Sequence, residues 1–151
     1  IESFIPEKDE AMSEETAYLM LDLMKGVVQS GTGVRLRVKY GLNNPIAGKT
    51  GTTQNQSDGW FMGITPDLTT GVWVGAEDRS VHFRSIRLGQ GANMALPVWA
   101  LYMQKVLADK TLHISKGDFE MPVQPLTVQL NCDKFEKDQE NLEEELEIME
   151  F

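Results

Sequence analysis

Gly48-Lys49-Thr50-Gly51-Thr52-Thr53 is the stretch from which the fold can be worked out. It lies between a short apolar lead-in at 45–47 and a polar turn at 54–58, the pattern of a strand that ends in a loop. Glycine inside a strand often marks a close approach by a ligand or another backbone. The threonine hydroxyls and the Lys49 ammonium are donors suited to a carboxylate. The stretch therefore predicts an edge strand that receives an extended anionic ligand. The alternative is an ordinary Thr-rich edge strand with Lys49 as a guard against aggregation.

Composition limits the classes of function. With 151 residues, 41% of them apolar, the chain is long enough for one domain with a buried core. The net charge is −9, and the segment 131–151 alone holds nine acidic residues and two lysines. An acidic chain without a basic cluster argues against binding to nucleic acid. Because Cys132, His82 and His113 lack the spacing of metal ligands, we expect no metal and no cofactor.

Hydrophobic periodicity predicts two long helices around a small sheet. Apolar residues recur at helical spacing over 14–29, after the N-cap candidate Ser13 and before Gly31. A second helix is predicted over 93–108, capped by Asn93 and with Pro97 near its first turn. Between them we expect three adjacent antiparallel strands: 46–53 at the edge, 60–64 in the middle and 71–76 beyond.

The segment 34–40 leaves two interpretations open. Val34, Leu36, Val38 and Tyr40 alternate with basic residues, which is the period of a strand. Most of these residues are also acceptable in a helix, so a short helix is the alternative.

Three longer strings make the motif far more specific than Lys-Thr-Gly alone. They are Lys49-Thr50-Gly51-Thr52-Thr53, then 58–67 with the sequence DGWFMGITPD, then 70–75 with the sequence TGVWVG. Together with SEETAYLM at 13–20, GVVQSGTG at 26–33 and ALPVW at 95–99, they resemble the transpeptidase domain of class A (bifunctional) penicillin-binding proteins. The resemblance covers roughly residues 13 to 107, and the tail beyond about 120 is outside it.

The resemblance is incomplete in one informative way. The family carries three active-site motifs, S-x-x-K, S-x-N and K-T-G. None of the seven serines of this sequence begins either of the first two motifs. The resemblance implies that the nucleophilic serine precedes residue 1, so that this chain is the C-terminal part of the domain and is inactive by itself.

The resemblance also implies roles for the residues that are present. The parent would be a serine-type D-Ala-D-Ala transpeptidase that cross-links peptidoglycan stem peptides through an acyl-serine and is acylated by β-lactams. Lys49 and Thr52 would be catalytic, Lys49 through its charge and Thr52 through a backbone N–H of the oxyanion hole. Thr50, Gly51, Thr52 and Thr53 would bind the substrate, with Thr50 and Thr52 offering hydroxyls to its terminal carboxylate. No metal is implied.

The expected architecture is α+β, a mainly antiparallel sheet flanked by helices, as in part of the serine β-lactamase and D,D-peptidase fold. We expect a lead-in at 1–12, the transpeptidase part at 13–120, and a flexible exit and acidic tail at 121–151. The parent would lie at the periplasmic face of the bacterial inner membrane, with its anchor and a glycosyltransferase domain outside this chain. The isolated piece is expected to self-associate. Two rivals remain: a class B penicillin-binding protein or serine β-lactamase, and a non-catalytic binding module with the same sheet.

Overall fold

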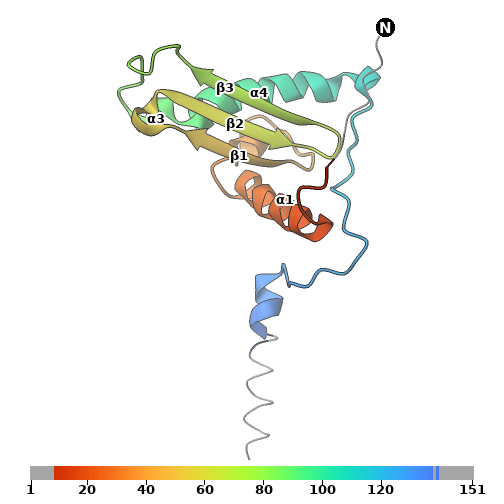
Figure 1. The fold of residues 1–151 in the computed structure, drawn as a ribbon. Coiled ribbons are helices and arrows are strands. Elements are labelled where there is room, and N and C mark those ends of the chain that lie inside the picture. Colours follow the sequence, from red (N-terminus) through yellow and green to blue (C-terminus); the bar gives the residue numbers. More distant parts are fainter. Residues whose placement is uncertain (1–8, 138, 140–151) are drawn as a thin grey trace, which may run out of the picture. The chain divides into compact units, whose positions relative to one another are not determined.

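The computed structural model describes residues 9–137 and 139. The chain divides into two compact units, Ile1–Met121 and Pro122–Phe151, which are described separately. The first unit contains the sheet and the long helices (Figure 1). In the second unit, residues 132–137 and 139 are helical. Residues 1–8 of the predicted lead-in at 1–12 and most of the acidic tail lie outside the described residues.

A three-stranded antiparallel sheet forms the centre of the first unit, in the order β1-β2-β3. Its strands are β1 (Ala47–Thr52), β2 (Asp58–Ile64) and β3 (Thr69–Gly75). The short 3-10 helix η1 (Gln54–Gln56) connects β1 to β2. The predicted strand order and pairing are confirmed, although each strand begins or ends one to two residues away from its predicted bounds.

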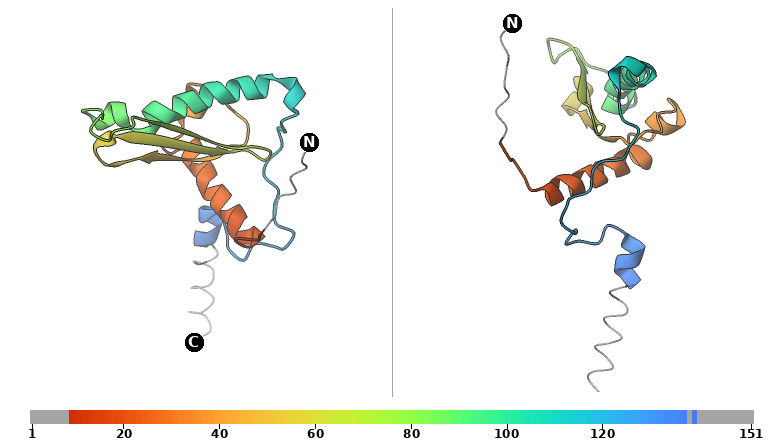
Figure 2. Two further views of the ribbon diagram at one scale, coloured as in Figure 1. Left: turned by 45° about the horizontal axis from the view of Figure 1, so that its top comes forward. Right: turned by 90° about the vertical axis from the view of Figure 1, so that its right-hand side faces the viewer.

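Helix α4 (Gly91–Ala108) packs along one face of this sheet, as Figures 1 and 2 show. Phe61 of β2 and Trp99 of α4 are both fully buried, and their rings meet edge to face with centroids 5.0 Å apart. Gly63 lets this contact form, because a Cβ at that position would lie 2.2 Å from the indole ring of Trp99. Leu96 and Met103 of α4 are also fully buried, which confirms the predicted apolar stripe of this helix.

The start of α4 differs from the prediction. The helix begins at Gly91 after Gln90, so Asn93 lies inside its first turn and is not the cap. The Asn93 side chain instead accepts a hydrogen bond from the Arg35 guanidinium and donates one to the Arg87 carbonyl. Pro97 therefore lies inside the helix, where its missing N–H leaves one intrahelical hydrogen bond unmade.

Helix α1 (Glu14–Gln29) lies beside β1 (Figure 1). Its predicted bounds are confirmed, and the Ser13 hydroxyl accepts a hydrogen bond from the Thr16 N–H over 3.2 Å as an N-cap. The apolar stripe of α1 is less buried than its width suggests. Val28 is fully buried, whereas Met20 and Leu23 are among the exposed large apolar residues.

The open question at 34–40 is decided in favour of a helix. Helix α2 (Arg35–Val38) is a single turn, in which the Lys39 N–H donates to the Arg35 carbonyl over 2.9 Å. Leu36 is fully buried, while Val38, two residues later, is 78% exposed. A half-buried strand would place both side chains on the same face. The segment with the alternating pattern therefore does not form a strand. The segment 77–90, between β3 and α4, contains the short helix α3 (Ile86–Gly89).

Candidate functional site

Strand β1 lies at one edge of the sheet and carries four of the five residues that the sequence singles out, 49–52, and Thr53 directly follows it. Among the strands that the structure describes, β1 pairs with β2 alone, so its other edge is unpaired. The register places Thr50 opposite Phe61, on the face covered by α4, and Lys49 opposite Met62, on the other face. The predicted site therefore combines a free strand edge with side chains on both faces of that strand.

The side chain of Lys49 is exposed. Its ammonium donates a hydrogen bond to the Thr50 backbone carbonyl over 2.9 Å. Among the residues that the structure describes, no ion pair is found for Lys49, whereas Lys25 pairs with Asp118. The charge of Lys49 is thus available to an anionic ligand at the strand edge.

Thr50 is linked to the segment that follows α1. Its hydroxyl lies 2.9 Å from the hydroxyl of Thr32, and either oxygen can donate. Because Thr32 lies three residues after the end of α1, this contact ties the middle of β1 to the loop that follows that helix. Sequence reasoning did not single out Thr32 as a site residue. Its place between two glycines, Gly31 and Gly33, was the available signal for a functional loop.

Thr52 is held by the first residue of α4. The Gly91 N–H donates to the Thr52 hydroxyl over 3.0 Å. A Cβ at Gly91 would lie 2.2 Å from the Gly51 carbonyl oxygen, so only glycine permits the helix to come this close to β1. A hydroxyl has one donor and two lone pairs, so Thr52 can still donate its proton to a ligand. Gly91 was also missed by sequence reasoning.

The Thr53 hydroxyl is engaged in the turn between β1 and β2. It lies 3.0 Å from the Ser57 hydroxyl and 3.2 Å from the Asp58 carbonyl, and it accepts from the Asp58 N–H over 3.1 Å. Asn55 and Gln56 in this turn have φ values of 57° and 54°, in the left-handed region. Thr53 therefore stabilises a tight turn directly after the predicted ligand strand.

Three further observations concern metal binding, membrane crossing and a buried carboxylate. Among the described residues no group of three or more His, Cys, Asp or Glu side chains could hold a metal ion. Over the same residues, the helices are too short or too polar to cross a membrane. One carboxylate oxygen, Oδ1 of Asp58, is buried at the start of β2 and has no hydrogen-bond partner there.

The chain is similar to known proteins over most of its length. The family model described as penicillin binding protein transpeptidase domain matches residues 5–78. Penicillin-binding protein 1A of Aquifex aeolicus is 34% identical over 131 residues, which is 87% of this chain and 17% of that protein. Penicillin-binding protein 1A of Pseudomonas aeruginosa is 38% identical over 116 residues, covering 74% of this chain and 13% of that protein.

A solved structure supports the same relationship. The crystal structure of penicillin-binding protein 1A from Haemophilus influenzae matches 76% of this chain, with a TM-score of 0.61 and 27% sequence identity, and 17% of its own chain is covered. The α+β architecture with an antiparallel sheet and flanking helices is thereby confirmed. This chain spans less than a fifth of the length of these relatives. It belongs to the penicillin-binding protein transpeptidase family and corresponds to part of the transpeptidase domain of the class A type, penicillin-binding protein 1A.

Proposed function

We propose that β1 is the substrate strand of a D,D-transpeptidase that cross-links peptidoglycan stem peptides. The observation that carries this proposal is the unpaired edge of β1, with the exposed Lys49 beside it. An extended peptide can add to such an edge as a further strand, with its backbone bonded to β1. A stem peptide that ends in D-Ala-D-Ala is extended and carries a terminal carboxylate, which matches both features.

Each residue of the strand has a proposed role in this complex. Thr50 and Thr52 offer hydroxyl protons to the terminal carboxylate, and Gly51 lets the peptide backbone approach without a Cβ in the way. The Thr52 backbone N–H stabilises the oxyanion of the tetrahedral intermediate, an interaction worth about 3 kcal/mol in the transition state. Lys49 supplies positive potential next to the reacting centre. Thr53, whose hydroxyl is used by the turn, supports binding by holding the end of the strand.

The proposed reaction needs a serine that these 151 residues do not supply in an S-x-x-K motif. Its Oγ attacks the carbonyl between the two D-alanines, the C–N bond breaks, and the last D-Ala leaves with the proton of the serine. The amine of a second stem then attacks the acyl ester, forms the cross-link and returns the proton to the serine. A β-lactam acylates the same serine by opening its ring. The serine and its lysine are proposed to belong to a longer parent that lies at the periplasmic face of the inner membrane.

The test uses a fluorescent penicillin, because acylation leaves a covalent label that survives a denaturing gel. We expect the 151-residue chain alone to remain unlabelled. In a chain extended to include the S-x-x-K motif, we expect Lys49→Ala to slow acylation by about a hundredfold or more, the effect of losing one strong electrostatic group. The melting temperature should stay nearly unchanged, since exposed substitutions usually alter stability by about 0.5 kcal/mol or less.

Lys116→Ala is the matched control, because Lys116 is also exposed but lies far along the chain from β1. Equal acylation rates in the Lys49→Ala and Lys116→Ala variants would remove Lys49 from the site. A labelled band for the 151-residue chain alone would show that the nucleophile lies within it. A parent that binds penicillin reversibly but is never acylated would favour the non-catalytic binding module.

A further inference from the structure

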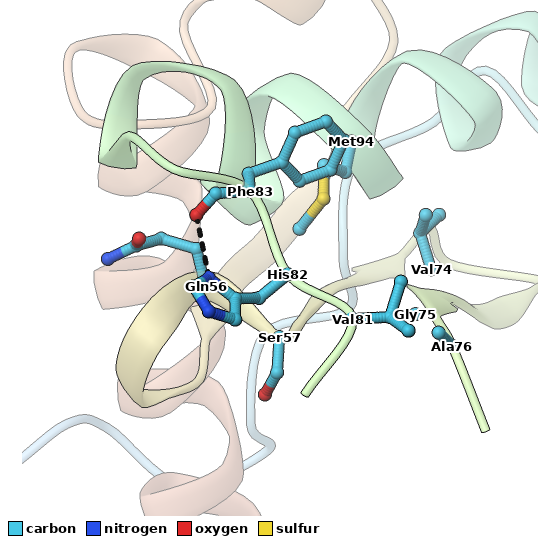
Figure 3. A pocket seen from close by; sticks show the side chains of 9 residues that line it. All are labelled: Gln56, Ser57, Val74, Gly75, Ala76, Val81, His82, Phe83 and Met94. Carbon is cyan, nitrogen blue, oxygen red and sulfur yellow. Dashed lines mark hydrogen bonds between the residues drawn. The ribbon is translucent and has the colours of Figure 1, made fainter. Parts of the chain in front are cut away.

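A pocket lies behind the turn that follows β1, on the face of the sheet covered by α4. Its volume is about 310 Å3, within the range of small-molecule sites. The wall is built from the η1 turn, the end of β3, the segment 81–83 and Met94 of α4 (Figure 3). Nothing in the roles proposed for Lys49 to Thr53 uses this pocket.

Among the described residues, the lining is mainly apolar and includes no carboxylate, lysine or arginine. Its apolar side chains, labelled in Figure 3, include Val74, Val81, Phe83 and Met94. Val81 and Phe83 remain 61% and 43% exposed, so the rim presents apolar surface to solvent. None of the described residues that line the pocket is acidic or basic apart from the imidazole of His82. A charged ligand would therefore lose its hydration without gaining an ion pair, which is unfavourable.

One polar group of the wall has a defined hydrogen-bonding character. Nδ1 of His82 lies 3.1 Å from the Phe83 carbonyl oxygen. A carbonyl oxygen can only accept, so in the neutral ring Nδ1 carries the proton, and Nε2 is left as an acceptor. The hydroxyl of Ser57, by contrast, is already paired with Thr53. Nε2 of His82 can thus receive a hydrogen bond from a ligand, and Gln56 and Ser57 are the other polar residues of the wall.

We propose that this pocket binds a small uncharged aromatic molecule or group that carries one N–H or O–H donor. The ring packs among Val74, Phe83 and Met94, and the donor bonds to Nε2 of His82. A planar ring suits the site because aromatic and sulfur-containing side chains pack well against such a face. This proposal does not depend on the transpeptidase function proposed above.

Two sets of contacts connect the wall of the pocket to the end of β1. Ser57, in the wall, shares a 3.0 Å hydrogen bond with the Thr53 hydroxyl. Met94 lies in the same first turn of α4 as Gly91, whose N–H bonds to the Thr52 hydroxyl. A bound molecule would therefore contact Ser57, which bonds to Thr53, and Met94, which lies three residues after the Gly91 that bonds to Thr52.

The experiment uses indole, an uncharged aromatic with one N–H, titrated into the full 151-residue chain labelled with 15N throughout and with 13C at the methionine methyl groups. The Met94 signal is identified by its loss in Met94→Leu. We expect a saturable shift of the Met94 methyl and of the Thr53 amide. 1-Methylindole, which lacks the N–H, should bind at least several times more weakly. His82→Phe, which keeps a ring but removes the acceptor, should abolish the difference between the two probes.

Ala76→Leu narrows the pocket by enlarging its wall and should weaken indole binding about tenfold or more. Ala11→Leu makes the same chemical change at an exposed site before α1 and should leave binding unchanged. The absence of a saturable Met94 shift in the unaltered chain would overturn the proposal. Equal affinities for both probes, unaffected by His82→Phe, would overturn the assignment of His82. Because His82 is exposed, that variant tests the idea even where Ala76→Leu disturbs the fold.

Discussion

The two faces of the three-stranded sheet differ in how deeply their large apolar side chains are buried. On one face, Phe61 and Trp99 are fully buried and meet edge to face under α4. On the opposite face, Trp60, Met62 and Trp73 remain 44%, 42% and 47% exposed. The register places Trp60 directly opposite Trp73, so these residues form one continuous apolar surface across β2 and β3. We call this surface the open face, and the surface beneath α4 the closed face.

The contrast shows that side-chain chemistry alone does not tell which face of a strand is closed. Strand β2 is apolar at nearly every position, as expected for a central strand, and its central position is confirmed. Yet the described residues cover only the side of β2 that meets α4. Stability should therefore depend on the closed face, whereas association should depend on the open face.

Two tryptophan substitutions should give the largest difference between the faces. Trp99→Ala removes a fully buried ring and its hydrogen bond to the Thr70 hydroxyl, so we expect a loss of about 3–5 kcal/mol in the free energy of unfolding. Trp73→Ala on the open face should cost about 1 kcal/mol or less, because half of that ring is already in water. Urea unfolding measures both. Equal losses would mean that the open face is covered in solution.

Two glycines provide a finer test of the same contrast. Gly63→Ala would put a Cβ 2.2 Å from the buried Trp99 ring, and we expect a cost of about 1–3 kcal/mol from overpacking. Gly71→Ala would put a Cβ 2.4 Å from the Met62 sulfur, on a flexible side chain that is 42% exposed and can move away. Its effect should be close to zero. Thermal unfolding compares the pair, and a larger loss for Gly71→Ala would reverse our assignment of the faces.

The open face should also drive self-association. Strand β3 pairs with β2 alone among the described strands, and it carries neither a charge nor a proline that would protect its free edge. We expect dimers or larger species in sedimentation at high micromolar concentration. Association should be stronger at high salt, because the segment 131–151 carries a net charge of −7 and its repulsion is then screened.

Trp73→Lys should reduce this association, because it places a charge in the centre of the open face. Val38→Lys is the control, because Val38 is 78% exposed but lies in α2, away from the sheet. A strictly monomeric chain at both salt concentrations, without apolar surface accessible to a dye, would contradict the prediction.

The smallest effect is expected at a surface ion pair that holds α1. The Lys25 ammonium donates to both carboxylate oxygens of Asp118, over 3.0 and 2.9 Å. These hydrogen bonds, together with one from the Phe119 N–H, lower the pKa of Asp118. A carboxyl whose pKa is lower in the folded state stabilises the fold above its unfolded pKa, and this stabilisation is lost as the pH falls through the folded value.

Asp118→Asn should therefore cost less than about 1 kcal/mol near neutral pH, since the Asp118 side chain is 59% exposed, and nothing in strong acid. Asp109→Asn is a suitable comparison, because Asp109 is also a surface carboxylate with a lowered pKa, held by Thr111 instead of a lysine. Added salt should reduce the cost at Asp118 but not at Asp109. Chemical unfolding at several pH values provides the measurement.

Much of this fold could be predicted from local sequence signals. The bounds of α1 follow from Ser13 and from helical spacing, and the strand order follows from short loops between apolar segments. The sequence also placed Lys49 and its neighbours at a sheet edge, because a strand so rich in glycine and threonine has little to bury. The longer strings around this motif resembled the family that the comparisons then identified.

Other features could not be predicted, because they depend on which segments meet. The strand-like alternation at 34–40 belongs to a helical turn, since Leu36 enters the core alone and Arg37 donates to the carbonyls of Leu42 and Asn44. The start of α4 was misplaced because its first turn is fixed by β1 rather than by a capping side chain. Asparagine often caps helices, but the Asn93 side chain instead accepts from Arg35 and donates to the Arg87 carbonyl.

The sequence by itself determined the antiparallel α+β pattern, the edge strand and the family, because residue type, period and motif are local properties of the chain. Only the tertiary structure decided how that strand is held. The Thr32 contact to Thr50, the Gly91 contact to Thr52 and the closed face under α4 each join segments far apart in sequence. The physical reason is that hydrogen-bond partners and buried neighbours are set by packing, and the same threonine or tryptophan can face either a helix or water.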